Sequence, residues 1–187
     1  MEKVKKVLLV VFVMMFFIGI ILVTDFGKMQ KYKNNEVTDL ANLGYRQMQT
    51  GDLVTGKVDY VLDTVAEEYE TKFGIRTSDD STKLYYIISL PNSYAVYETS
   101  NKEEYDTLDK ICNETWDYLN SEDGSAPAPT SNLMIQGEVK KMDDKVAGYF
   151  KDWFKEQADF SDEDFEKNTE VYMICLLYTS PSPRDRG

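Results

Sequence analysis

The longest apolar run of the chain lies near its N-terminus, where Val7–Val23 contains no charged residue. A helix rises about 1.5 Å per residue, so Val7–Thr24 would span about 27 Å, close to the ~30 Å hydrocarbon core of a bilayer. A helix also satisfies its own backbone amides, as lipid requires. The pattern predicts a transmembrane anchor over residues 1–24.

A cleaved secretory signal peptide is the alternative, and it would have a shorter apolar core followed by small residues at a cleavage site. Here the run is long, and Thr24–Lys28 shows no Ala-x-Ala pattern, so a retained anchor is favoured. Lysines flank both ends of the run, which leaves its orientation undecided by the positive-inside rule. Because long domains are exported largely regardless of charge, we expect the N-terminus in the cytoplasm and the bulk of the chain outside.

The segment after the anchor is polar up to residue 52, and we expect a juxtamembrane stalk over residues 25–52 that is helical in part over Glu36–Gln49. Leu53–Ala66 then alternates apolar and polar residues, which is the period of one half-buried strand. Glu67–Asp80 is acidic and polar, and an exposed connection is expected there.

A hairpin and a helix are predicted next. Lys83–Leu90 is apolar on both faces, as a central strand is, and Tyr94–Thr99 follows a Pro-Asn-Ser turn as its partner. Ser100–Glu103 has the spacing of a capping box, and apolar residues recur at intervals of three and four over Lys102–Asn120. A connection rich in Gly, Pro and Ser over Ser121–Ser131 ends this part.

The last elements are a strand over Leu133–Lys140, a helix capped by Asp143, a short helix capped by Ser161 and a strand over Thr169–Ile174. In the helix after Asp143, one face is expected to hold Val146, Tyr149, Phe150, Trp153 and Gln157. The order of elements predicts an α+β domain over residues 53–174, in which a small antiparallel or mixed sheet carries two amphipathic helices on one face.

The C-terminal segment Cys175–Asp185 resembles the in-frame translation of a transposase sequencing adapter, codon for codon. An ordinary disordered tail rich in Ser and Pro is the alternative. We interpret residues 175–187 as an adapter-derived artefact, and expect the natural chain to continue beyond Ile174 in other residues.

The chain is acidic, with 33 Asp and Glu residues against 21 Lys and Arg residues and a formal net charge of −12. This balance argues against a nucleic-acid partner, whose affinity depends on cationic side chains, and against docking flat on anionic lipid. The chain has no histidine, the commonest general base and transition-metal ligand. With Cys175 set aside, Cys112 has no partner for an intrachain disulfide.

Carboxylates supply the first candidate chemistry, as a calcium site or an acid–base pair, in an acidic run over Asp152–Glu166. The run lacks the spacing of a calcium-binding loop, so a solvated helix face is favoured. Core packing is favoured over a ligand platform for the tyrosines between Tyr85 and Tyr105 and for the two tryptophans. Cys112 is read as a small buried hydrophobe, and Asn113-Glu114-Thr115 as a chance glycosylation sequon inside a helix.

The segments Gly56–Val58 and Gly137–Val139 are alike, and the favoured interpretation is two unrelated strands whose glycines mark bulges. An internal duplication is the other interpretation. The sequence assigns no catalytic, cofactor-binding or metal-ligating residue and no cofactor.

Several segments together resemble an uncharacterised family of small membrane proteins of clostridial-type gut bacteria: the N-terminal anchor, TGKVDYVLDTVAEEYE, LYYIISLP, DKICNETWDYLN and IQGEVKKMDD. The resemblance implies a membrane setting, and often a second membrane-spanning segment after the domain. It implies no activity.

Three functions remain open. The favoured hypothesis is a non-catalytic envelope module that contacts the bilayer through residues 7–24 and binds a protein partner or helps to assemble a complex. The others are a carboxylate- or metal-dependent hydrolase and a structural spacer between two membrane helices.

Overall fold

The computed structural model describes Gln30 and residues 37–72, 75–121 and 125–177. The predicted anchor Val7–Thr24 lies outside these residues. Within them, no helix has both the length and the apolar character needed to span a bilayer.

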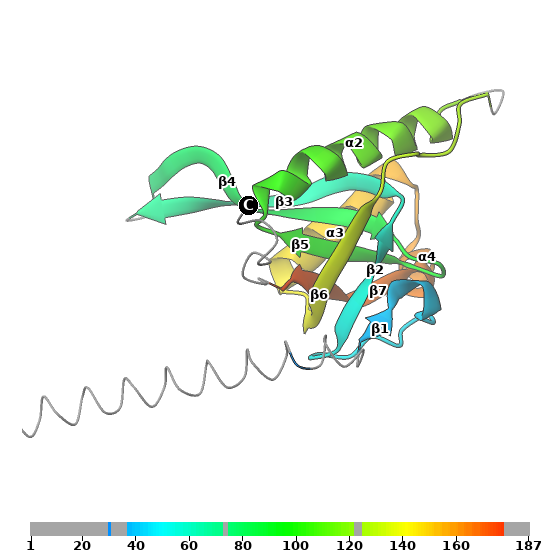
Figure 1. Cartoon of the computed structure of the whole chain (residues 1–187), viewed down its shortest axis with the longest axis horizontal. Helices are drawn as coiled ribbons and strands as arrows, with labels where there is room; N and C mark the ends of the chain where they lie inside the picture. The colour runs from blue at the N-terminus through cyan, green and yellow to red at the C-terminus, as the bar shows by residue number, and fades with distance from the viewer. Residues whose placement is uncertain (1–29, 31–36, 73–74, 122–124, 178–187) are drawn as a thin grey trace, which may run out of the picture. The chain divides into compact units, whose positions relative to one another are not determined.

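A mixed sheet forms the centre of the described fold, with its strands in the order β1-β2-β6-β7-β5-β4-β3 (Figure 1). The strands are β1 Thr38–Asp39, β2 Leu53–Val58, β3 Val61–Lys72, β4 Ile75–Ser89, β5 Tyr94–Thr99, β6 Leu133–Lys141 and β7 Thr169–Leu176. The β1–β2 and β5–β7 pairs are parallel and the other pairs are antiparallel. The predicted α+β class with a mixed sheet is therefore confirmed.

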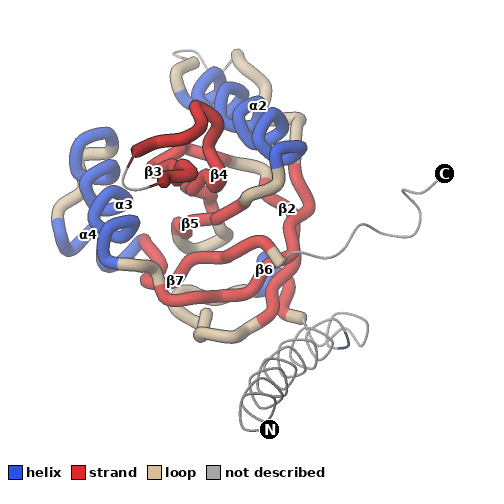
Figure 2. The backbone as a smooth tube through the Cα atoms, turned by 90° about the vertical axis from the view of Figure 1, so that its left-hand side faces the viewer, coloured by secondary structure: helices blue, strands red, loops and turns tan. Residues whose placement is uncertain are grey.

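The helices cover both faces of this sheet, whereas one face was expected (Figure 2). They are the 3-10 helix η1 Leu40–Asn42, α2 Lys102–Leu119, α3 Asp144–Gln157 and α4 Asp162–Asn168. Leu108 and Ile111 of α2 share a core with Tyr86, while Phe150 and Phe154 of α3 share a second core with Tyr85. Neighbouring strand residues point to opposite faces, so a strand that is apolar on both faces needs cover on both.

The helix starts agree with the sequence in two of three cases. Asp143 caps α3, and Ser161 forms a capping box with Asp164 at α4, as predicted. The cap of α2 is Asn101, one residue later than the proposed box, with its amide donating to Glu104. In α3 the buried face is Val146, Phe150 and Phe154, and Tyr149 is 45% exposed, so the predicted face is wrong by a small rotation about the helix axis.

Two expectations about the strands are wrong. The expected single strand over Leu53–Ala66 is two strands, β2 and β3, because the chain turns at Asp59 and Tyr60, where alternation continues and neither glycine nor proline marks the change. The expected connection over Glu67–Asp80 instead belongs to β3 and β4, which extend beyond β5 as a two-stranded ribbon (Figure 1). Polar cross-strand contacts support that ribbon, such as Ser81 Oγ donating to Glu67 Oε2 at 2.7 Å. The sequence of the ribbon therefore lacks the apolar alternation from which a strand is predicted.

The folded unit begins at Thr38, inside the expected stalk. Leu40, Leu43 and Met48 are 2, 8 and 2% exposed and belong to the core, and only η1 is helical between residues 37 and 52. At the other end, β7 continues through Cys175 and Leu176, two residues past its predicted end. The adapter origin of residues 175–187 stays a prediction, and residues 178–187 lie outside the described part.

Both tryptophans hold the edge strand β3, and they do so from helices on opposite faces of the sheet. Trp116 of α2 donates its indole N–H to the Leu62 carbonyl at 2.6 Å, and Trp153 of α3 donates to Asp63 Oδ2 at 2.7 Å. Thr115 of α2 accepts from the Val61 amide at 3.3 Å. Backbone groups at a sheet edge are otherwise open to pairing with another chain, so these contacts close part of the edge.

Replacing Trp116 by Phe tests this contact. The variant Trp116→Phe keeps an aromatic ring and removes the shorter of the two hydrogen bonds to the Leu62 carbonyl, leaving only the thiol of Cys112 at 3.3 Å, so we expect a loss of about 1 kcal/mol in unfolding free energy. Chemical denaturation of the full chain in a mild non-ionic detergent measures it. Tyr118→Phe is the control, because Tyr118 is 40% exposed on the same helix. Equal stability of the two variants would contradict the role given to Trp116.

Candidate functional site

A cavity lies beside the part of β2 that β1 does not cover. In the described residues, β1 pairs only with Val54 and Thr55, and the chain then turns into η1. Asp39 caps that turn by accepting from the Ala41 amide at 2.9 Å. A Cβ at Gly56 would lie 2.7 Å from the Cβ of Leu40, so glycine is what lets η1 approach β2 this closely.

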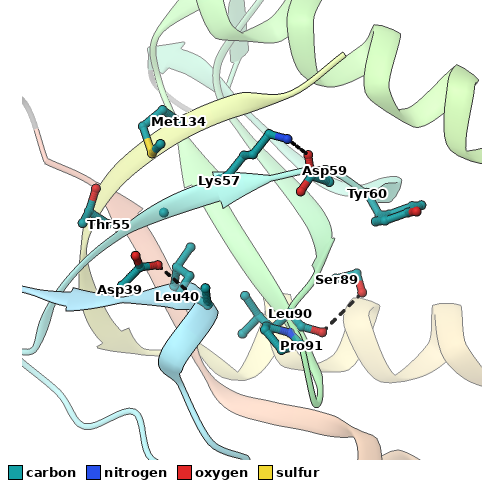
Figure 3. A pocket seen from close by; sticks show the side chains of 12 residues that line it. Asp39, Leu40, Thr55, Lys57, Asp59, Tyr60, Ser89, Leu90, Pro91 and Met134 are labelled. Atoms are coloured by element: carbon teal, nitrogen blue, oxygen red, sulfur yellow. Dashed lines mark hydrogen bonds and ion pairs between the residues drawn. The ribbon is translucent and has the colours of Figure 1, made fainter. Parts of the chain in front are cut away.

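This β2-edge cavity has a volume of about 670 Å³ and is lined from four places in the chain (Figure 3). Its lining comes from η1, from β2 and the turn after it, from the end of β4 with the following turn, and from β6. Leu40, Leu90, Pro91 and Met134 supply apolar walls, and Met134 is 65% exposed. The size lies within the range of small-molecule sites.

Each charged side chain that lines this cavity already has a partner. Lys57 Nζ lies 2.7 Å from Asp59 Oδ1, and the Asp39 carboxylate is the cap of η1. Both members of the ion pair are about half exposed, so the pair contributes little to stability. What the cavity offers to a ligand is therefore mainly apolar surface beside an open strand edge.

A second cavity of about 300 Å³ lies between α3 and β3, and we call it the α3 groove. The residues that line it are Thr64, Val65, Tyr149, Asp152, Trp153 and Glu156. From Tyr149 the helical residues follow at three, four and seven positions, and so lie on one side of α3. Sequence reasoning had assigned Tyr149 and Trp153 to the core, so the groove was missed.

A buried carboxylate, Glu170, joins three segments next to the start of β7. Its Oε1 accepts from the Arg46 amide at 3.0 Å and from Ser93 Oγ at 2.8 Å, and the side chain is 3% exposed in the surrounding core. Arg46 has a φ of 54°, a left-handed conformation that non-glycine residues seldom adopt. Glu170 Oε2 has no hydrogen-bond partner among the described residues. The sequence offered no signal for this residue beyond a glutamate at the start of an apolar strand.

The carboxylates of the acidic run do not gather at one point. Lys151 and Lys155 each lie 2.8 Å from Asp162 Oδ1, and these lysines lower the pKa of Asp162 to about 2. Asp164 belongs to the capping box of α4. In the described ranges, no group of three or more Cys, Asp or Glu side chains is placed to hold a metal ion.

The other candidates have structural contacts. Cys112 Sγ donates to the Leu62 carbonyl at 3.3 Å, and burial raises the pKa of its thiol to about 11, so the thiol is protonated at neutral pH. Tyr85, Tyr86 and Tyr97 are at most 2% exposed, which confirms core packing. In the sequon, Thr115 is 1% exposed and donates to the Ile111 carbonyl at 2.8 Å.

The two similar glycine segments lie on neighbouring strands. Gly56 pairs with Ile135 and Gly137 with Val54, in a register without shifts, so neither glycine marks a bulge between these strands. A Cβ at Gly137 would instead collide with Ile174 Cγ2 of β7. Each glycine therefore makes room for a neighbouring side chain.

A family model described as a domain of unknown function, DUF8577, matches residues 1–179, and the chain belongs to this family. No curated protein and no solved structure matches the chain. The expectation of an uncharacterised family is thereby confirmed, while the membrane setting and the bacterial source stay predictions.

Glu114 generates a prediction about pH, because this carboxylate holds the segment before β6 against α2. It accepts from the amide and hydroxyl of Ser131 at 2.8 and 2.7 Å and from the Thr130 amide at 2.8 Å. The hydrogen bonds from Ser131 are the largest cause that lowers the pKa of Glu114 to about 2. A lowered pKa in the folded state means that the ionised form stabilises the fold, fully above about pH 4.5 and progressively less towards about pH 2.

Thermal denaturation of the wild type and of Glu114→Gln over this range measures the effect. We expect the wild type to be more stable by a constant difference above about pH 4.5, and the difference to shrink as the pH falls towards 2. A difference that does not change with pH would contradict the assignment.

Proposed function

We propose that the protein is a non-catalytic binding module of the cell envelope, whose partner docks at the β2-edge cavity. The proposal rests on which side chains of the cavity remain available to a ligand. Its charged groups are engaged within the fold, whereas Met134, 65% exposed, and the side chains around it present apolar surface. Apolar concave surface of this size favours binding over acid–base chemistry.

The setting proposed for this module is a membrane. Residues 7–24 would tether the domain to the bilayer, in one pass in the chain as it stands and in two if the natural chain continues into a second apolar segment. We place the domain on the extracytoplasmic side. The net charge of −12 supports a protein partner over a nucleic acid.

Site-specific photocrosslinking tests the proposal. A photoreactive amino acid is introduced at Met134 in the full-length protein, and the same residue is introduced at Leu119 as the control. Leu119 is 53% exposed on α2 and does not line the cavity. In native membranes, we expect a discrete adduct from position 134 that position 119 does not give.

Two results would overturn the proposal. One is the same set of adducts from both positions. The other is no adduct from position 134, together with recovery of the full-length protein alone under several mild detergents.

A further inference from the structure

The α3 groove combines two aromatic rings with two carboxylates. Tyr149 and Trp153 lie one helical turn apart, and so do Asp152 and Glu156, all lining one cavity against β3. Tyr149 is 45% exposed, and Lys145 Nζ of the same helix lies 5.8 Å from its ring centroid, so the exposed ring already has an ammonium group near it.

The two carboxylates make no ion-pair contact within the described residues, although the charge of Asp152 acts on nearby Lys151. Lys151 and Lys155 of α3 both bind Asp162 of α4 instead. Like charges four positions apart on a helix repel each other and destabilise it. Proteins tend to break such local rules where a functional site compensates for the cost.

The indole of Trp153 is held in place before any ligand arrives. Its N–H donates to Asp63 Oδ2 at 2.7 Å, and its ring packs edge-on against Phe154 with centroids 5.0 Å apart. The Asp63 carboxylate also accepts from the Thr64 amide through Oδ1 at 2.8 Å, which fixes the acceptor in turn. A preorganised ring loses little freedom on binding.

We infer that the α3 groove binds an alkylammonium group, as a small amine or quaternary ammonium compound. An aromatic face attracts a cation, and nearby carboxylates add attraction without selecting a hydrogen-bond pattern. The cavity of about 300 Å³ is at the lower end of ligand sites, which suits a small cation. A sugar would also stack on aromatic rings, but the unpaired negative charge favours a cation. The groove shares no lining residue with the β2-edge cavity, so this inference stands apart from the proposed function.

Nuclear magnetic resonance of the full chain in a maltoside detergent tests the inference, because the chain has two indole N–H signals. The probes are tetramethylammonium, choline and Nα-acetyl-lysine amide, which separate quaternary from primary ammonium ligands. The matched neutral probe is 3,3-dimethylbutanol, which has the shape of choline without its charge. We expect a saturable shift of the Trp153 signal with at least one cation, an unmoved Trp116 signal, and at least about tenfold weaker binding of the neutral probe.

Two pairs of variants sharpen the test. Asp152→Asn/Glu156→Gln should abolish the shift and leave thermal stability equal or higher, since it removes repulsion; Asp117→Asn, an exposed charge removal on α2, should leave the shift intact. Tyr149→Ala should weaken binding, while Tyr149→Phe, which keeps the ring, should retain it. The inference is overturned if no cation shifts the Trp153 signal, if the neutral probe or glucose binds as well as the cations, or if the double variant still binds.

Discussion

The fold depends on β7, because this strand joins two parts of the sheet that are not otherwise paired with each other within the described residues. On one side lie β6, β2 and β1, and on the other lies the meander of β5, β4 and β3. Within β7, Ile174 is buried in the core beneath α2 and Met173 in the core beneath α3. Glu170 at its start fixes the Arg46 loop and the turn between β4 and β5. The two helical layers on either side of the sheet and the two parts of the sheet are therefore all connected through β7.

The features predicted correctly from the sequence are those that depend on neighbouring residues along the chain. The caps at Asp143 and Ser161, the two-faced apolar strand β4 and the helical periodicity of α2 all depend on residues within a few positions of each other. The turn at Asp59 and the ribbon of β3 and β4 were missed because alternation and polar composition do not change there. Strand order follows from long-range packing, and no single segment encodes it.

The candidate sites could not be read from the sequence for the same reason. The β2-edge cavity collects residues from positions near 40, 57, 90 and 134, which share no motif. The α3 groove depends on the rotation of α3 about its own axis. Phe154 turns inwards and Tyr149 outwards, although both are aromatic and both fit an apolar stripe within one turn of helix.

Some of the acidic residues stabilise the core as hydrogen-bond acceptors, in addition to making the surface negatively charged. Buried tyrosines need acceptors for their hydroxyl groups, and carboxylates at the rim of the core supply them. Tyr86 donates to Asp109 at 2.9 Å and Tyr97 to Glu104 at 2.8 Å. Thus a chain rich in tyrosine satisfies hydroxyl groups of its core with carboxylates from its own excess of acidic side chains.

The partly closed edge of β3 has a consequence for aggregation. Where copies of a chain are crowded together, an open strand of one copy can template the next and fibrils can grow. Because α2 occupies backbone groups of Val61 and Leu62, that route is blocked at the root of the ribbon in the native state. Detachment of α2 would expose backbone groups of Val61 and Leu62 to pairing with a strand of another copy.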